Sequence, residues 1–245
     1  MKHINILLIL LLIVSLGACS SETNTSSTSV ESSTSSSDPA PAKEEFTYEI
    51  SNVQEKIEEN PYWGTSFDVV VEITNTGNVP IYMHKCVLDY EDNDGHLLQT
   101  YDFMSKVPDV VEPGDKGYFY GKSYFDEGVD FSNGSVLKPK VSIEKAKGTL
   151  TSYPVEDVSL YNDYNAVGCK GRIINETDEE VSYIYLTVVY YGSDGEILGI
   201  TGTSVTDILP NDKTSFDCSG LMLSGFTVDD VVDYRIYCDE MYMQF

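Results

Sequence analysis

One strand and turn pattern occurs twice in this chain, and this repetition constrains the fold more than any other feature. Six residues recur at a spacing of one hundred positions, and four more recur at a spacing of ninety-seven. Repetition that keeps turn and core positions while exposed positions differ indicates a duplicated structural unit. The chain is therefore expected to contain two modules of one architecture. The recurring pairs are Ile73 and Ile173, Asn75 and Asn175, Tyr90 and Tyr190, Asp94 and Asp194, Gly95 and Gly195, Leu98 and Leu198, Pro113 and Pro210, Asp115 and Asp212, Lys116 and Lys213, and Phe119 and Phe216.

The residue types favour strands over helices in both modules. Tyrosine occurs 18 times, and no stretch has the long apolar periodicity of a capped helix. Short apolar runs are separated by turn residues at intervals of about ten positions, which is typical of a two-sheet sandwich. We predict the all-β fold class, with two tandem immunoglobulin-like β-sandwich domains at residues 45–147 and 152–245. The expected strands are 67–74, 81–90, 97–98, 116–120, 141–143, 169–174, 181–191, 197–201, 215–218 and 234–238.

Residues 1–18 have the pattern of a lipoprotein signal peptide. The apolar run from Ile4 to Val14 follows Lys2 and is too short for a membrane-spanning helix, which requires about 20 residues. The run leads to Leu16-Gly17-Ala18-Cys19, which resembles the bacterial lipobox. The resemblance implies that a diacylglycerol is attached to the Cys19 thiol and that residues 1–18 are removed. The alternative is an ordinary secretory signal with an unrelated cysteine.

The lipidated cysteine and the segment after it form residues 19–44. Most of this segment is Ser, Thr, Glu, Asn, Pro and Ala, a composition that cannot bury a core and predicts a disordered linker. Such a long polar segment after the cysteine is similar to those of Gram-positive surface lipoproteins. We therefore expect a protein at the cell membrane, anchored on its extracellular face by the N-terminal lipid on Cys19.

The charge balance excludes one class of partner. The chain has 15 Lys and Arg residues against 40 Asp and Glu residues, a formal net charge of −25. Nucleic acids and anionic lipid headgroups bind through basic side chains, so we expect no nucleic-acid partner. The expected partners are the membrane, through the lipid, and an unknown envelope protein or glycan.

Four segments of the second module follow one another in an order that can be compared with a known domain family. They are Gly171-Arg172-Ile173-Ile174-Asn175, then Val188-Val189-Tyr190-Tyr191-Gly192, then Ser193-Asp194-Gly195, and finally Pro210-Asn211-Asp212 leading to Phe216. This order resembles the FxLYD-type domain of bacterial secreted proteins and lipoproteins. In the first module, Leu88-Asp89-Tyr90-Glu91-Asp92 occupies the place of the family motif. The resemblance implies an extracellular β-sandwich in each module and carries no catalytic residues with it.

No pattern in the sequence specifies a reaction, a cofactor or a metal site. After residue 18 the only histidines are His84 and His96, and neither belongs to a nucleophile motif. We expect His84 to share the core-facing parity of Cys86 and Leu88, and His96 to lie in a solvated turn. The acidic segment 91–95 lacks the spacing of a calcium loop and is expected to be a hairpin turn. The prediction is a protein that is not an enzyme.

The cysteines after residue 19 are expected to be buried. Cys86 takes the place of Leu186 in the repeat, which predicts a small core residue. Cys169, Cys218 and Cys238 share the parity of core residues in the second module, so one disulfide is possible among three pairings. We favour buried free thiols over a disulfide.

Four aromatic residues are candidate ligand contacts. Tyr62 and Trp63 lie between Pro61 and Gly64 and could stack on a sugar or clamp a peptide. The alternative for Trp63 is packing at the edge of the sandwich. Tyr161 and Tyr164 precede the second module and could line a groove between the modules.

These observations predict a lipid-anchored extracellular protein that acts as a non-catalytic binding, interaction or spacer module at the cell envelope. One alternative is a lipoprotein that captures a solute or a glycan for a transporter. Another is an accessory subunit of an envelope hydrolase.

Overall fold

The computed structural model describes residues 43–60, 62, 64–102, 104–163, 166–219 and 225–240. Over this part the chain forms strands joined by turns, with one short 3-10 helix, which confirms the predicted all-β class. Among the described residues, no helix is long and apolar enough to cross a membrane. Cys19 and almost all of the predicted linker lie outside the described residues, so both stay predictions.

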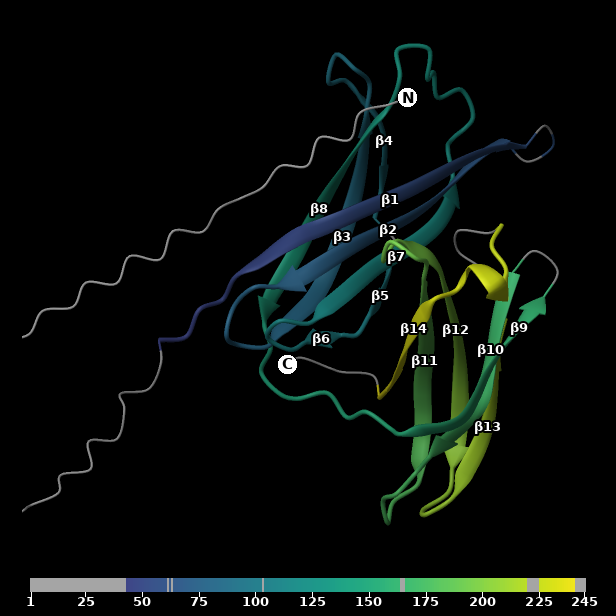
Figure 1. Cartoon of the computed structure of the whole chain (residues 1–245). Helices are drawn as coiled ribbons and strands as arrows, with labels where there is room; N and C mark the ends of the chain where they lie inside the picture. Colours follow the sequence, from purple (N-terminus) through teal and green to yellow (C-terminus); the bar gives the residue numbers. More distant parts are fainter. Residues whose placement is uncertain are drawn as a thin grey trace, which may run out of the picture. The chain divides into compact units, whose positions relative to one another are not determined.

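The first half of the described chain forms two antiparallel sheets (Figure 1). One has the order β1-β2-β7-β5. In the other, β3 pairs with β4 and β6 along one edge and with β8 along the opposite edge. The strands are β1 (Tyr48–Asn60), β2 (Gly64–Asn75), β3 (Ile81–Glu91), β4 (Leu97–Tyr101), β5 (Ser105–Val107), β6 (Val110–Val111), β7 (Lys116–Tyr124) and β8 (Val136–Lys145).

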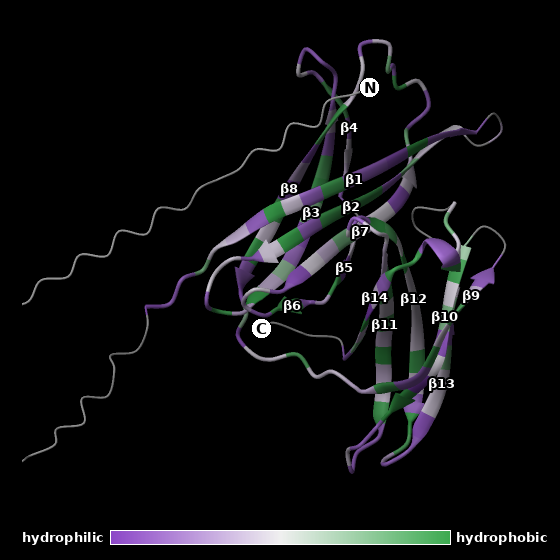
Figure 2. Cartoon of the chain, viewed as in Figure 1, coloured by the Kyte–Doolittle hydropathy of each residue, from purple (hydrophilic) through white to green (hydrophobic). Residues whose placement is uncertain are grey.

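The second half also forms two antiparallel sheets, with the orders β13-β10-β9 and β12-β11-β14. In Figure 2 the turns at the lower end of this half are mostly hydrophilic, while hydrophobic residues recur along β11. The strands and the 3-10 helix are β9 (Val155–Asp163), β10 (Ala166–Ile174), β11 (Val181–Tyr191), β12 (Ile197–Ile208), β13 (Lys213–Cys218), η1 (Val228–Asp230) and β14 (Asp233–Asp239).

Each half has its own hydrophobic core between its two sheets, and the repeated apolar residues lie in these cores. In the first core Phe67, Val69 and Val71 of β2 contact residues of β3 and β8. The second core combines β10 and β13 with β11 and β14. At most 4% of each repeated core side chain is exposed, so the repetition in the sequence preserves core positions. These side chains are Ile73, Ile173, Tyr90, Tyr190, Phe119 and Phe216.

Two long strands were not expected from the sequence. β1 forms the edge of its sheet and pairs only with β2, and Val53 and Ile57 in it remain 39% and 41% exposed. β9 is likewise an edge strand, paired with β10. Edge strands lie over the rim of a core and tolerate polar residues at both parities, so neither segment has a clear strand pattern.

The predicted orientation of His84 is wrong. Its side chain is exposed, whereas the neighbouring Met83 is fully buried with Cys86 and Leu88. The cause is an irregularity in the pairing of β3 with β8 between Met83 and Lys85. One extra residue in a strand reverses the parity of the residues that follow it.

A third hydrophobic cluster joins the two halves. Val70, Tyr118 and Tyr120 project from the β1-β2-β7-β5 sheet on the side opposite its own core, and they meet Val189, Ile197, Ile200 and Tyr237 of the second half. All seven side chains are at most 6% exposed. One sheet of each half therefore has part of its outer face buried as well as the face toward its own core.

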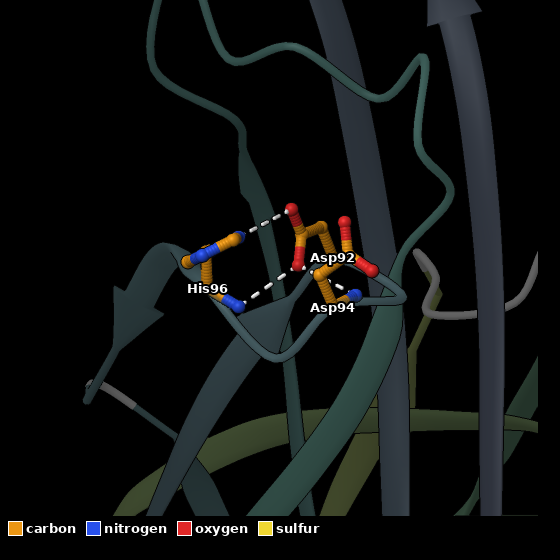
Figure 3. A group of neighbouring side chains, drawn as sticks. All are labelled: Asp92, Asp94 and His96. Atoms are coloured by element: carbon orange, nitrogen blue, oxygen red, sulfur yellow. Dashed lines mark hydrogen bonds and ion pairs between the residues drawn. The ribbon is translucent and has the colours of Figure 1, made fainter.

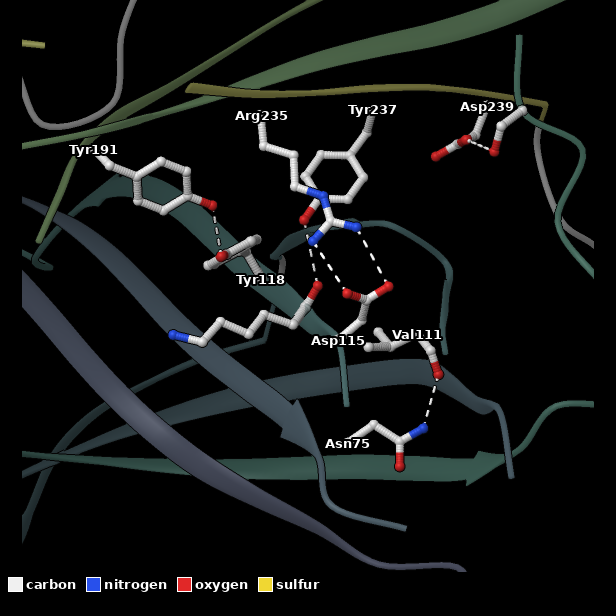
Figure 4. A network of polar contacts seen from close by, with 10 residues as sticks. Asn75, Val111, Asp115, Tyr118, Tyr191, Arg235, Tyr237 and Asp239 are labelled. Carbon is white, nitrogen blue, oxygen red and sulfur yellow. Dashed lines mark hydrogen bonds and ion pairs between the residues drawn. The ribbon is translucent and has the colours of Figure 1, made fainter. Parts of the chain in front are cut away.

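Polar contacts surround this third cluster (Figure 4). The hydroxyl oxygens of Tyr118 and Tyr191 are 2.7 Å apart, and the Tyr237 hydroxyl donates to the Lys116 carbonyl oxygen at 3.3 Å. The two terminal nitrogens of Arg235 lie 3.4 Å from the carboxylate oxygens of Asp115. These bonds give the hydroxyls of Tyr118, Tyr191 and Tyr237 hydrogen-bond partners, as buried tyrosine hydroxyls require.

Candidate functional site

A pocket of about 450 Å³ lies beside the third cluster, between strands of the two halves. Its floor and walls combine aromatic rings with carboxylates, a composition suited to ligand binding. The first half contributes Tyr82 of β3 and the segment 104–109 around β5. The second half contributes Tyr183 and Tyr185 of β11 together with Asp239 and Glu240 at the end of β14. We call this the junction pocket.

One wall of the junction pocket already holds an ammonium group of the chain itself. The Lys106 Nζ atom lies 4.1 Å from the centre of the Tyr82 ring. The same atom is 3.0 Å from a carboxylate oxygen of Asp109 and donates to the Met83 carbonyl oxygen. A cation over an aromatic ring beside a carboxylate is favourable, because the face of the ring is electron-rich.

The second half lines the junction pocket with two carboxylates, Asp239 and Glu240. Asp239 accepts a hydrogen bond from the Ser152 hydroxyl at 2.5 Å, and Glu240 accepts one from Tyr153. Burial raises the pKa of Asp239, and the negative charge of Asp109 adds to this, while the bond from Ser152 opposes it. A positive group entering the pocket would stabilise the ionised form of Asp239.

The sequence did not single out the residues of the junction pocket. Tyr183 and Tyr185 remain 41% and 40% exposed, while Ile184 between them is fully buried. Both tyrosines therefore lie on the face of β11 that points away from its own core. In β11, tyrosines occur at both odd and even positions. This pattern could have indicated that the strand packs against other residues on both of its faces.

The two candidate ligand contacts near residue 62 have different outcomes. Tyr62 lies in a turn before β2 and is 87% exposed. It borders a hollow that also includes Phe125 and Phe131. Trp63 lies outside the described residues, so its role stays a prediction.

Tyr161 lies on β9, and its ring packs over Gly168 of the neighbouring strand. A Cβ atom at position 168 would be 2.2 Å from the Tyr161 ring. The Tyr161 hydroxyl donates to Asp217, and the Lys170 ammonium is 5.7 Å from the ring centre. These partners all belong to the second half, and Tyr161 is absent from the third cluster. Tyr164 lies outside the described residues.

Asp92, Asp94 and His96 form the hairpin turn after β3 (Figure 3). Their ligand atoms lie within 4.8 Å of one another. One Asp92 carboxylate oxygen accepts from the backbone nitrogens of Asp94 and His96 at 2.9 and 2.8 Å, and the other lies 3.0 Å from Nδ1 of His96. Backbone and side-chain hydrogen bonds with His96 lower the pKa of Asp92 to about 2. These bonds account for the acidic cluster as a hairpin turn, which confirms the turn predicted for residues 91–95.

The four cysteines within the described residues are buried and unbridged. Cys86 is 1% exposed in the first core, and Cys169, Cys218 and Cys238 are at most 4% exposed in the second. Burial raises the pKa of Cys86 and that of Cys238, each to about 12. The predicted inward orientation of all four is confirmed.

Comparison with known proteins gives no family for the chain. No protein-family model matches it, and no curated protein does. A crystal structure of red sea bream transglutaminase is similar at 13% sequence identity, with a TM-score of 0.22. The similarity covers 69% of this chain, which spans only 27% of the transglutaminase. The matched protein is an enzyme, which contradicts the sequence prediction that the chain is not one, and we withdraw that prediction. At this TM-score the similarity supports no argument about a reaction.

Proposed function

We propose that this chain is a lipid-anchored extracellular protein of the bacterial cell envelope that binds a partner in the junction pocket. The observation that carries the binding part is the pocket itself, where Tyr82, Tyr183 and Tyr185 face a common space with Asp109 and Asp239. The lipobox resemblance at Cys19 supports the location, and the FxLYD resemblance of both modules agrees with it.

The favoured partner is an envelope protein that inserts a basic side chain. Lys106 illustrates the chemistry, because its ammonium group lies over Tyr82 and beside Asp109. A lysine or arginine of a partner would meet the equivalent combination at Tyr183, Tyr185 and Asp239. The net charge of −25 favours approach of a basic surface over an acidic one.

Removal of the lipidated thiol tests the location. Cys19→Ala is expected to move the protein from the membrane fraction to the medium, because two acyl chains hold a protein at a bilayer and a polar linker does not. The measurement is immunoblotting of cell fractions, with Cys86→Ala as the control that retains the membrane association. Retention of the Cys19→Ala protein in the membrane fraction would contradict lipid anchoring.

Truncation of a pocket tyrosine tests the binding site. Tyr183→Ala is expected to reduce recovery of the partner in proximity labelling on intact cells roughly fivefold or more, because exposed tyrosines in interfaces contribute strongly to affinity. Tyr234→Ala is the matched control, since Tyr234 is 38% exposed on β14 and lies outside the pocket. Equal recovery by both variants would place the partner elsewhere.

The tyrosines also favour a second candidate, capture of a glycan or small solute. Aromatic rings stack on sugars, and carboxylates accept hydrogen bonds from sugar hydroxyls. Labelling confined to wall polymer, and lost in Tyr183→Ala, would support this candidate over a protein partner.

A further inference from the structure

Cys169 and Cys218 lie directly opposite each other on two neighbouring strands. They are paired residues in the antiparallel register of β10 and β13. Their side chains are 0% and 1% exposed within the second core. The Cys218 thiol donates to the Cys169 carbonyl oxygen at 3.3 Å, and the Thr201 hydroxyl lies 3.5 Å from the Cys218 sulfur.

This register satisfies the geometric requirement of a disulfide. Opposite residues on antiparallel strands have Cα atoms about 4.5–5.5 Å apart. Disulfides span Cα separations of about 4.4–6.8 Å, so this pair needs no large backbone movement to close. The two sulfurs also start on the same side of the sheet, because directly opposite side chains share a face.

The other two described cysteines have no such neighbour. Cys238 lies on β14 in the facing sheet, opposite Leu186, and Cys86 lies in the first half, opposite Val141. Among the three cysteines of the second module, Cys169 and Cys218 are the two that lie directly opposite each other in a strand register.

We propose that Cys169 and Cys218 form a disulfide that joins β10 to β13 when the chain folds in an oxidising environment. The two thiols lose two protons and two electrons, and a low-molecular-weight disulfide accepts the electrons. The Cys218 thiolate attacks that reagent and releases one small thiol, and the Cys169 thiolate then displaces the second. The core burial of both sulfurs keeps the finished bond away from reductants. In the cell, the oxidant would come from the extracellular environment, and in this respect alone the proposal rests on the proposed function.

The test uses refolding of the purified Cys19→Ala protein, which removes the N-terminal thiol. The protein is unfolded with reductant and refolded either with a mixture of oxidised and reduced glutathione or with reduced dithiothreitol. Each product is then denatured, alkylated and digested. With glutathione, we expect alkylation of Cys86 and Cys238 only, a linked peptide containing Cys169 and Cys218, and a midpoint of thermal unfolding roughly 5–15 °C above that of the reduced protein.

Two variants separate this bond from other effects of oxidation. Cys238→Ala is expected to keep the linked peptide and the oxidation-dependent shift, and Cys218→Ala is expected to lose both. Full alkylation of all four cysteines after refolding with glutathione, or a bridge that includes Cys86 or Cys238, would overturn the proposal. Because the linked peptide of the Cys19→Ala protein decides the pairing, the result stands even where the further substitution Cys218→Ala prevents folding. A bond formed in vitro but absent in cells would instead contradict the proposed location.

Discussion

Asn75→Ala is expected to lower the free energy of unfolding by about 3–5 kcal/mol, one of the largest effects of any single substitution in the chain. Asn75 is fully buried, and its amide nitrogen donates to the carbonyl oxygens of Val79 and Val111 at 2.9 Å each. Its side-chain oxygen accepts from the Gly77 nitrogen at 3.0 Å. Alanine would leave the carbonyl oxygens of Val79 and Val111 without this donor, at about 1–3 kcal/mol for each buried group. The Gly77 nitrogen would keep its bond to the Thr47 carbonyl oxygen at 3.0 Å. Urea unfolding followed by circular dichroism measures the loss.

The repeated residue of the second half provides an independent test. Asn175 is also fully buried and donates to the carbonyl oxygens of Glu179 and Ile208 at 2.8 and 3.1 Å. Asn175→Ala should therefore destabilise to a similar degree. Asn133→Ala is the control, because Asn133 is exposed and its amide bonds to the half-buried Asp92 and the exposed Asp94 in a hairpin turn. If Asn75→Ala and Asn175→Ala each lower the free energy of unfolding by less than about 1 kcal/mol, the role assigned to these asparagines is wrong.

This shared role explains why the asparagines recur in the sequence. In each half the backbone nitrogen of the asparagine donates to the carbonyl oxygen of the repeated aspartate, Asp115 at 3.0 Å and Asp212 at 2.9 Å. The same residue thus ends one strand, closes the following turn and connects to the turn before β7 or β13.

Gly95 and Gly195 recur for a conformational reason, because both have positive φ values, +86° and +75°, in their hairpin turns.

Much of the fold could be predicted because the cores follow an alternating pattern. The segments that became β2, β3 and β11 contain runs in which every second residue is apolar, and turn residues mark their ends. β1 could not be recognised because Lys56, Glu58 and other polar residues line it, and its stability comes from pairing with β2. The exposed position of His84 was equally hidden, since an extra residue in a strand leaves no local mark in the sequence.

Less of the candidate site could be predicted, because it depends on contacts between residues far apart in the chain. Tyr183 and Tyr185 were visible as tyrosines in a strand, but their position opposite Tyr82 and Asp109 follows from the packing of one half on the other. The cysteines show the same limit. Parity predicted that Cys169, Cys218 and Cys238 face inward, whereas only the strand register distinguishes one pair from the other two.

The packing of the halves leads to the second large prediction, for Val70→Asp. Val70 lies on the outer face of β2 and is 1% exposed in the third cluster. The same face carries Asp68 and Glu72, which pair with Lys122 at 3.2 Å and Lys116 at 2.9 Å. A further carboxylate between them would have no lysine and would be buried against apolar side chains. We expect Val70→Asp to lower the free energy of unfolding by about 3–5 kcal/mol. We also expect the variant to unfold in two separate transitions, one for each half, in place of one cooperative transition. Differential scanning calorimetry measures both effects.

Two further variants show whether this loss comes from the contact between the halves. Ile200→Asp places a charge in the same cluster from the second half, since Ile200 is 1% exposed there, and should give the same separation of transitions. Val136→Asp is the control, because Val136 is 41% exposed at the start of β8. If Val70→Asp and Ile200→Asp each retain one transition at the temperature of the control, the two sheet faces do not support each other. If each variant instead separates the transitions, the outer faces of the two sheets act as a third core, and the junction pocket beside it depends on that core for its shape.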